Sequence, residues 1–159
     1  MTQEHDPVAD ALNAAGIPAA FRTFPEGTDT AEQAAAAAGC ELNAIVKSLV
    51  FMAGDELILA LVAGGNRLDE AKLASALESA HRVRKATARE VESRTGFKIG
   101  TVPPIGHRAP LRVVIDRELL NHREVWAASG VRHRIFPIAP VMLAAVAHGL
   151  ITDIHQTTD

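Results

Sequence analysis

Cysteine is nearly absent from this chain of 159 residues, and the one that is present, Cys40, has no partner for a disulfide within the chain. A disulfide framework is therefore excluded, which fits a reducing compartment. The seven histidines are scattered, with no i,i+4 pair and no accompanying cysteine cluster, so no metal site is expected. Cys40 follows a predicted helix C-terminus, where the helix dipole disfavours a thiolate, so we interpret it as a small buried residue rather than a nucleophile.

Other familiar signals are missing too. No GxGxxG or Walker-type loop follows a predicted strand, so no nucleotide cofactor is expected. The formal net charge of −3 argues against a protein that coats nucleic acids along their length, because such a protein needs a basic surface. It is compatible with local contact to one end of an RNA. The first residues lack a basic start followed by an apolar run, and the apolar runs are too short to span a membrane. We expect a cytoplasmic protein that contacts neither DNA nor a membrane.

The chain has 48% apolar residues, which is enough for a hydrophobic core of ordinary size. Residues 1–159 are predicted to form one domain. Capping boxes at Thr30 and Thr87, helix-ending glycines such as Gly39 and Gly96, and period-two alternation predict interleaved helices and strands. The expected fold is therefore α/β with a mixed sheet. The expected helices cover residues 7–16, 31–38, 69–77, 87–96 and 140–149. The expected strands cover residues 20–24, 44–52, 57–63, 111–116, 124–129 and 134–138, with shorter extended segments at 81–85 and 151–154.

Lys47 is the most unusual side chain in this pattern. Alternation places it on the same strand face as Ile45, Leu49 and Phe51, where a cation costs free energy unless it finds a partner or water. The structural alternative is a lysine whose aliphatic stem lies on the sheet while its ammonium reaches solvent, or a lysine that keeps an edge strand from pairing with another chain. Because both faces of the strand are apolar, we favour a functional lysine. The adjacent Ser48 points to the opposite face, which argues against a serine–lysine dyad.

Residues 96–107 form an apolar loop with three glycines and the pair Pro103-Pro104. Proline fixes φ and restricts the preceding residue, while glycine allows positive φ and close approach, so the loop should be stiff. Its free amides, near Gly100 to Val102 and at Gly106, could stabilise a carbonyl oxygen that gains negative charge. A buried turn between two strands explains the same composition equally well.

Histidines and arginines supply weaker candidates. His107 ends the rigid loop and is the histidine best placed to contact a ligand, although a solvated loop histidine is the commoner case; whether His107 or His122 contacts substrate stays open. Two basic groups, residues 81–85 with Arg89 and residues 132–134, could contact RNA phosphates, but unpartnered surface charge is the more frequent explanation.

Four motifs in order resemble those of the YbaK/ProX aminoacyl-tRNA deacylases, free-standing relatives of the editing domain of bacterial prolyl-tRNA synthetases. Residues 30–35 (TAEQAA) are similar to that family's helix start, and residues 45–51 (IVKSLVF) to its lysine strand. Residues 100–106 (GTVPPIG) resemble its glycine–proline loop, and residues 114–119 (VIDREL) its strand ending in aspartate. The likeness extends from about residue 10 to residue 154. Thr101 and Pro103 stand where many relatives carry glycine and serine or threonine, which bears on pocket shape.

The resemblance implies a barrel-like mixed sheet surrounded by helices and hydrolysis of a mischarged aminoacyl-tRNA, carrying a small amino acid, at the 3′ adenosine of tRNA-Pro or a related tRNA. No cofactor and no protein nucleophile are implied, and the partners are the tRNA acceptor end and an aminoacyl-tRNA synthetase. The alternative is a non-catalytic module that binds aminoacyl-tRNA or a synthetase. The implied catalytic residues are Lys47 and Gly106. The implied substrate-binding residues are Thr30, Gly100, Thr101, Val102, Pro104, Ile105, His107 and Asp116.

Overall fold

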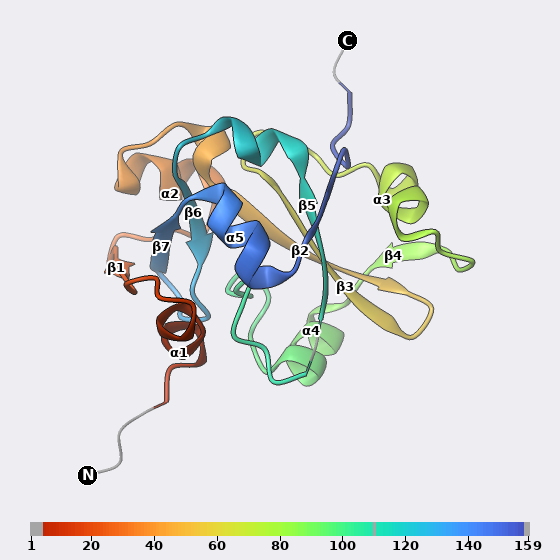
Figure 1. Cartoon of the computed structure of the whole chain (residues 1–159), viewed down its shortest axis with the longest axis horizontal. Helices are drawn as coiled ribbons and strands as arrows, with labels where there is room; N and C mark the ends of the chain where they lie inside the picture. The colour runs from red at the N-terminus through yellow and green to blue at the C-terminus, as the bar shows by residue number, and fades with distance from the viewer. Residues whose placement is uncertain (1–4, 110, 158–159) are drawn as a thin grey trace.

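Two β-sheets organise the chain in the computed structural model, which describes residues 5–109 and 111–157 (Figure 1). The larger sheet has the strand order β4-β2-β3-β5-β8 and the smaller one the order β1-β7-β6. The strands are β1 (Arg22–Thr23), β2 (Val46–Ala53), β3 (Glu56–Ala63), β4 (Val83–Lys85), β5 (Arg112–Asp116), β6 (Val125–Ala128), β7 (Arg134–Ile138) and β8 (Leu150–Thr152).

The larger sheet is mixed, as the sequence predicts. β2 and β3 form an antiparallel hairpin whose register pairs Lys47 with Val62, while β5 joins β3, and β8 joins β5, in parallel. The sheet is not a closed barrel, which corrects the barrel-like shape implied by the resemblance. The strands instead form two separate sheets, which in residues 5–109 and 111–157 are connected by one isolated bridge, between Ile45 and Trp126 just before β2 begins.

The helices begin at the residues that local chemistry predicts, although α1 and α5 each end two residues before the predicted end. They are α1 (Pro7–Ala14), α2 (Ala31–Ala38), α3 (Glu70–Leu77), α4 (Ala88–Thr95) and α5 (Pro140–Ala147), with short 3₁₀ turns η1 (Leu42–Ala44) and η2 (Arg117–Asn121). Thr30 and Thr87 each form a complete capping box with the residue three positions later. Gly39 and Gly96 end α2 and α4 in the left-handed conformation, which glycine adopts without the steric cost of a Cβ.

Side-chain alternation along β2 and β3 divides the core between the two faces of the larger sheet. Leu59 and Leu61 pack on one face with residues of α1, α4 and α5, whereas Ile58 and Val62 pack on the other face with α3. A third cluster joins α2 to the smaller sheet through Trp126. Both faces of the central strands are therefore covered, which explains why β3 is apolar at almost every position. Among the described residues, no helix is long and apolar enough to cross a membrane.

Candidate functional site

A cavity of about 730 Å³ opens at the junction of the two sheets. Its walls come from the start of α2, the first half of β2, the turn at residues 98–101 and the hairpin of β6 and β7. Ile45, Trp126 and Ile135 supply an apolar side, and the small side chains of Ala31 and Ala34 keep α2 from filling the space. An enclosed apolar wall with a few polar groups is the usual character of a small-molecule site.

Lys47 lines this cavity, close to the bridge that connects the sheets. Its ammonium donates to the backbone carbonyl of Asn66, and its side chain is half-buried. Burial lowers the pKa of Lys47 below its ordinary value, because removal of water disfavours the charged form; Glu32 acts in the opposite direction. A partly desolvated cation at a cavity wall interacts more strongly with a negatively charged group than one in water does.

Two further polar groups, which the sequence did not single out as ligands, line the same cavity. The side-chain atom Ser48 Oγ is buried and, among the described residues, has no hydrogen-bond partner, whereas the buried His133 Nε2 lies 3.4 Å from Asp29 Oδ1. A buried polar atom without a partner costs about 1–3 kcal/mol, so a ligand that satisfies it gains affinity. His133 also has a positive φ of 65°, a conformation that is uncommon outside glycine and often marks a functional site. No spacing in the sequence could have paired residues 85 positions apart.

The turn at residues 98–101 supplies Gly100 and Thr101 to the cavity. Gly100 has a φ of +87°, and an added Cβ would meet no atom within 4 Å, so the backbone conformation is what requires glycine here. The amide of Thr101 donates to the carbonyl of Lys98 at 3.0 Å and is not free. In the part of the chain that the structure describes, the Gly100 amide has no backbone acceptor. Of the predicted substrate residues, Thr30 also lines this cavity.

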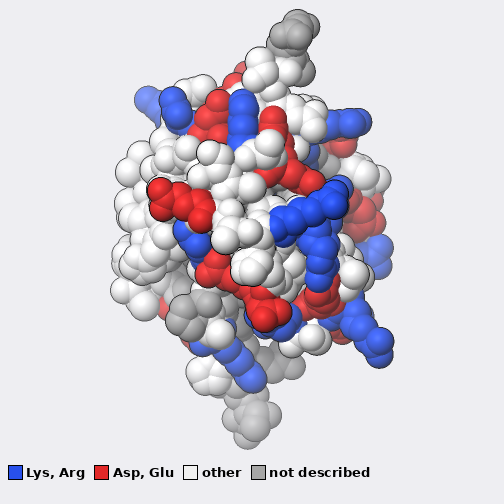
Figure 2. All heavy atoms as spheres, turned by 90° about the vertical axis from the view of Figure 1, so that its right-hand side faces the viewer, with Lys and Arg blue, Asp and Glu red and all other residues white. Residues whose placement is uncertain are grey.

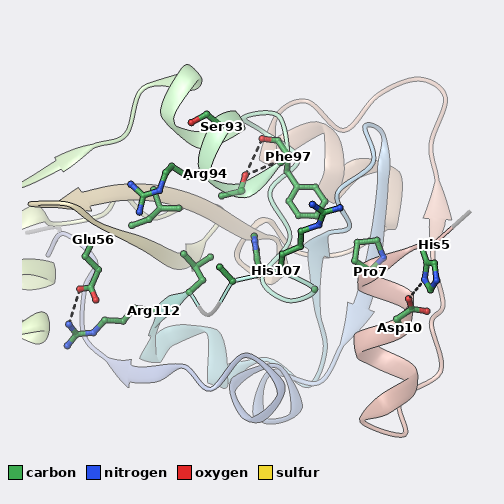
Figure 3. A pocket seen from close by; sticks show the side chains of 16 residues that line it. His5, Pro7, Asp10, Glu56, Ser93, Arg94, Phe97, His107 and Arg112 are labelled. Carbon is green, nitrogen blue, oxygen red and sulfur yellow. Dashed lines mark hydrogen bonds and ion pairs between the residues drawn. The ribbon is translucent and has the colours of Figure 1, made fainter.

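The remainder of the 96–107 loop lies elsewhere. Val102, Pro104 and Ile105 are buried, as in the alternative of a packed turn. Gly106 and His107 line a second cavity of about 900 Å³ between α1, α4 and the start of β5 (Figure 3). The structure therefore does not bring them to Lys47.

His107 is held firmly within that second cavity. Its ring meets Phe97 edge-on (Figure 3), its Nε2 donates to the carbonyl of Pro103 at 2.7 Å, and burial lowers its pKa. His122 lines neither cavity, and its Nδ1 lies 3.9 Å from Glu41 Oε2. These contacts give His107 a packing role in the loop.

Asp116, also predicted at the site, lies outside the cavity and is fully buried at the end of β5. Its carboxylate accepts from the backbone amide of Ile154 at 2.8 Å and meets the Nδ1 atom of His155 at 3.0 Å. It also accepts from the amide of Glu118 at 3.3 Å. Asp116 thus attaches the C-terminal segment to the sheet.

The contact with His155 predicts a dependence of stability on pH. Asp116 raises the pKa of His155, with Glu118 and Asp153 adding to the effect against partial burial. A raised folded-state pKa stabilises the fold below the unfolded pKa, and that stability is lost as pH rises through the folded value. We expect His155→Gln to lower the free energy of unfolding by on the order of 1 kcal/mol near pH 6, and by less near pH 9. Urea denaturation at both pH values measures the free energy of unfolding, with His81→Gln as a control at an exposed position. An equal loss of free energy at pH 6 and pH 9 would contradict the proposed effect of the His155 charge.

The same corner holds side chains of metal-ligand type, which the sequence spacing did not reveal. Ligand atoms of Asp116, Asp153 and His155 lie within 4.8 Å of one another. These ligand atoms already have partners within the protein, since the ammonium of Lys72 contacts the carboxylate of Asp153 at 3.1 Å and the ring of His155 contacts Asp116. The cluster lies outside the Lys47 cavity.

In the two basic groups, Arg84 and all three residues at 132–134 lie beside carboxylates. Arg84 forms a bidentate ion pair with Glu90, with both guanidinium nitrogens 2.8 Å from carboxylate oxygens, and this pair lowers the pKa of Glu90 to about 2. Arg132 pairs with Asp29 at the cavity mouth, and Arg134 pairs with Asp6. Figure 2 shows the end of the molecule that carries α3 and β4, where basic and acidic side chains are interspersed. This face offers no uniformly basic track for a nucleic-acid backbone.

Known proteins resemble this chain over most of its length. The family of aminoacyl-tRNA editing domains matches residues 25–145. YwhH of Bacillus subtilis is 34% identical over 122 residues, which are 76% of each chain. The proline–tRNA ligase of Solidesulfovibrio magneticus is 34% identical over 105 residues, which are 66% of this chain but only 18% of the ligase.

Solved structures extend the likeness to the whole fold. One, described as a candidate trans-editing enzyme for prolyl-tRNA synthetase, is 38% identical, with a TM-score of 0.88, and the match covers 98% of this chain and 100% of that one. Another, the protein APE2540, is 26% identical with a TM-score of 0.86, over 94% of this chain and 99% of that one. With the family match covering most of the sequence, the chain belongs to the aminoacyl-tRNA editing domain family.

Proposed function

We propose that this protein is a trans-editing hydrolase that cleaves the ester between a wrongly attached amino acid and the 3′ adenosine of a tRNA. The observation that carries the proposal is the cavity lined by the partly desolvated Lys47 together with two further polar residues, Ser48, whose hydroxyl has no hydrogen-bond partner among the described residues, and His133, whose Nε2 lies 3.4 Å from Asp29. An aminoacyl-adenosine ester has the matching groups, namely a phosphate or carbonyl oxygen for the cation and hydroxyl or amino groups for the other two.

The reaction needs little from the protein because the ester is already activated. Water attacks the ester carbonyl, the carbonyl oxygen becomes an oxyanion, and collapse releases the amino acid and the 3′ hydroxyl of the tRNA. Lys47 and the Gly100 amide are the groups in the cavity that can stabilise negative charge, the first on the terminal phosphate or on the reacting oxygen. No protein nucleophile is required, which accords with the burial of Cys40 and the resulting rise in the pKa of its thiol.

Ser48 and His133 are suited to recognising the amino acid or the ribose. Ser48 presents a buried hydroxyl without a partner and His133 a buried ring nitrogen 3.4 Å from Asp29, and a site with a buried polar atom rejects a ligand that leaves this atom unpaired. The apolar wall formed by Ile45, Trp126 and Ile135 then takes the aliphatic part of a small side chain. Discrimination by this wall alone would be weak, because one methylene is worth only about 1–3 kcal/mol.

The partner in this proposal is the acceptor end of an aminoacyl-tRNA, with tRNA-Pro as the first tRNA to test because of the likeness to proline–tRNA ligases and to a candidate trans-editing enzyme for the prolyl enzyme. Arg84, Arg132 and Arg134 are paired with carboxylates, which weakens any contact that they could make with the rest of the tRNA. A complex with an aminoacyl-tRNA synthetase would supply the contacts that this surface lacks.

The test is a panel of tRNA-Pro molecules charged with alanine, serine, cysteine or proline. We expect release of at least one small non-cognate amino acid and sparing of prolyl-tRNA. Ser48→Ala and His133→Ala should each lower the selectivity between amino acids by about tenfold, because each removes one hydrogen-bonding group. Saturable binding of the charged tRNA without release of any amino acid would instead identify a non-catalytic binding module.

A further inference from the structure

Lys47 is held by a contact that lies outside the cavity. Its ammonium donates to the backbone carbonyl of Asn66, a residue in the turn between β3 and α3 that does not line the cavity. A lysine side chain has many rotamers of similar energy, so a fixed acceptor is needed to keep its ammonium in one place. The position of the Asn66 carbonyl therefore sets the position of the cation.

The turn that presents this carbonyl is fixed from both sides. The amide of Gly65 donates to Asn43 Oδ1 at 2.8 Å, and the amide of Asn66 donates to the carbonyl of Ala63 at 2.9 Å. Gly64 packs so closely that an added Cβ would lie 2.4 Å from the carbonyl oxygen of Leu42. The turn thus rests directly against the segment that leads into β2.

The side chain of Asn66 makes a separate contact with η2. Its Nδ2 donates to Glu118 Oε2 at 2.5 Å, and the other oxygen of Glu118 lies 3.3 Å from His155 Nε2. The backbone amide of Glu118 is in turn bound by the buried Asp116. A continuous series of polar contacts therefore runs from Asp116 through Glu118 and Asn66 to Lys47.

We infer that Asn66, oriented by Glu118, is a positioning residue that fixes the ammonium of Lys47 for reaction in the cavity. The inference rests on the proposed function for its kinetic consequences, but the placement of Lys47 can be measured without substrate. The inference also gives Asp116 an indirect role, because its buried carboxylate accepts from the backbone amide of Glu118 and so helps to orient that residue. A displaced charge of this kind costs rate without removing a substrate contact.

The experiment compares Asn66→Ala, Glu118→Ala and the conservative Glu118→Gln, which keeps an oxygen acceptor for the Asn66 amide. Asn121→Ala, at an exposed position in the same 3₁₀ turn as Glu118, is the matched control. Two readouts are taken: the mobility of the Lys47 side chain by ¹³C relaxation at Cε in the ligand-free protein, and kcat and KM for deacylation. Melting temperatures confirm that each variant is folded.

We expect Asn66→Ala and Glu118→Ala to increase Lys47 mobility and to lower kcat about tenfold with KM nearly unchanged, while Glu118→Gln and Asn121→Ala resemble the wild type. Wild-type mobility of Lys47 in both alanine variants would overturn the inference, whatever the rates are. Increased mobility in a protein that hydrolyses no ester would support the positioning of Lys47 while refuting the proposed reaction. The two failures are therefore distinguishable.

Discussion

Replacing Lys47 with alanine should lower the rate of deacylation by at least about 100-fold while the protein stays folded. The ammonium is the cation that lines the cavity from β2, and removal of a charge-stabilising group of this kind typically costs that much in rate. Lys47→Arg should also fail, because a planar guanidinium cannot take the place of a compact ammonium held by a single carbonyl. Hydrolysis rates of both variants measure the effect.

The stability of the Lys47 variants separates this role from a structural one. The fold holds the pKa of Lys47 below its ordinary value, so the charged form disfavours folding at neutral pH. Lys47→Ala should therefore leave the melting temperature nearly unchanged, or raise it. Lys85→Ala, which removes an exposed lysine from the neighbouring strand β4, is the control and should retain full activity. A folded Lys47→Ala protein with wild-type activity would refute a role for the ammonium.

Gly106→Ala should destabilise the fold by about 3 kcal/mol, because it combines backbone strain with a steric clash. Gly106 has a φ of +86°, and an added Cβ would lie 2.9 Å from the carbonyl oxygen of Pro7 and 3.0 Å from the amide nitrogen of Val8. Both are backbone atoms at the start of α1, so neither can rotate away as the end of a flexible side chain could. Urea denaturation gives the loss in free energy directly.

Gly100→Ala is the matched control for that substitution. Gly100 has nearly the same φ, +87°, but open space around its Cβ position, so the variant should lose only about 1 kcal/mol of stability. Because Gly100 lines the Lys47 cavity and Gly106 does not, hydrolysis should fall more in Gly100→Ala than in Gly106→Ala. A stable Gly106→Ala protein that has lost hydrolysis would instead place the Gly106 amide in the reaction.

Local chemistry was enough to predict most of the elements. The capping boxes at Thr30 and Thr87 and the glycine stops at Gly39 and Gly96 depend on contacts within a few residues, and the structure confirms them. Alternation likewise separated the two faces of β2 correctly, because each side chain is placed by its own backbone. The division into two sheets was not predicted, since it depends on which strands pair across long stretches of chain.

The site was harder to predict for the same reason. Lys47 was recognisable because a cation in an apolar strand conflicts with its own neighbours. His133 and Asn66 show no such conflict locally; each gains importance only when folding brings it to the cavity or to Lys47. The loop at 96–107 was predicted to be either a ligand-facing unit or a buried turn, whereas the buried segment from Val102 to Ile105 divides it between two cavities.

Release of labelled amino acid from mischarged tRNA-Pro, with the tRNA in large excess over the protein, tests the proposed hydrolysis most directly. If the Lys47 cavity hydrolyses the 3′ ester, release will continue well beyond one equivalent per protein molecule, and an equal amount of Lys47→Ala protein will give a trace close to the rate without protein. A wild-type trace that follows the rate without protein, or that stops at one equivalent, would contradict the proposal.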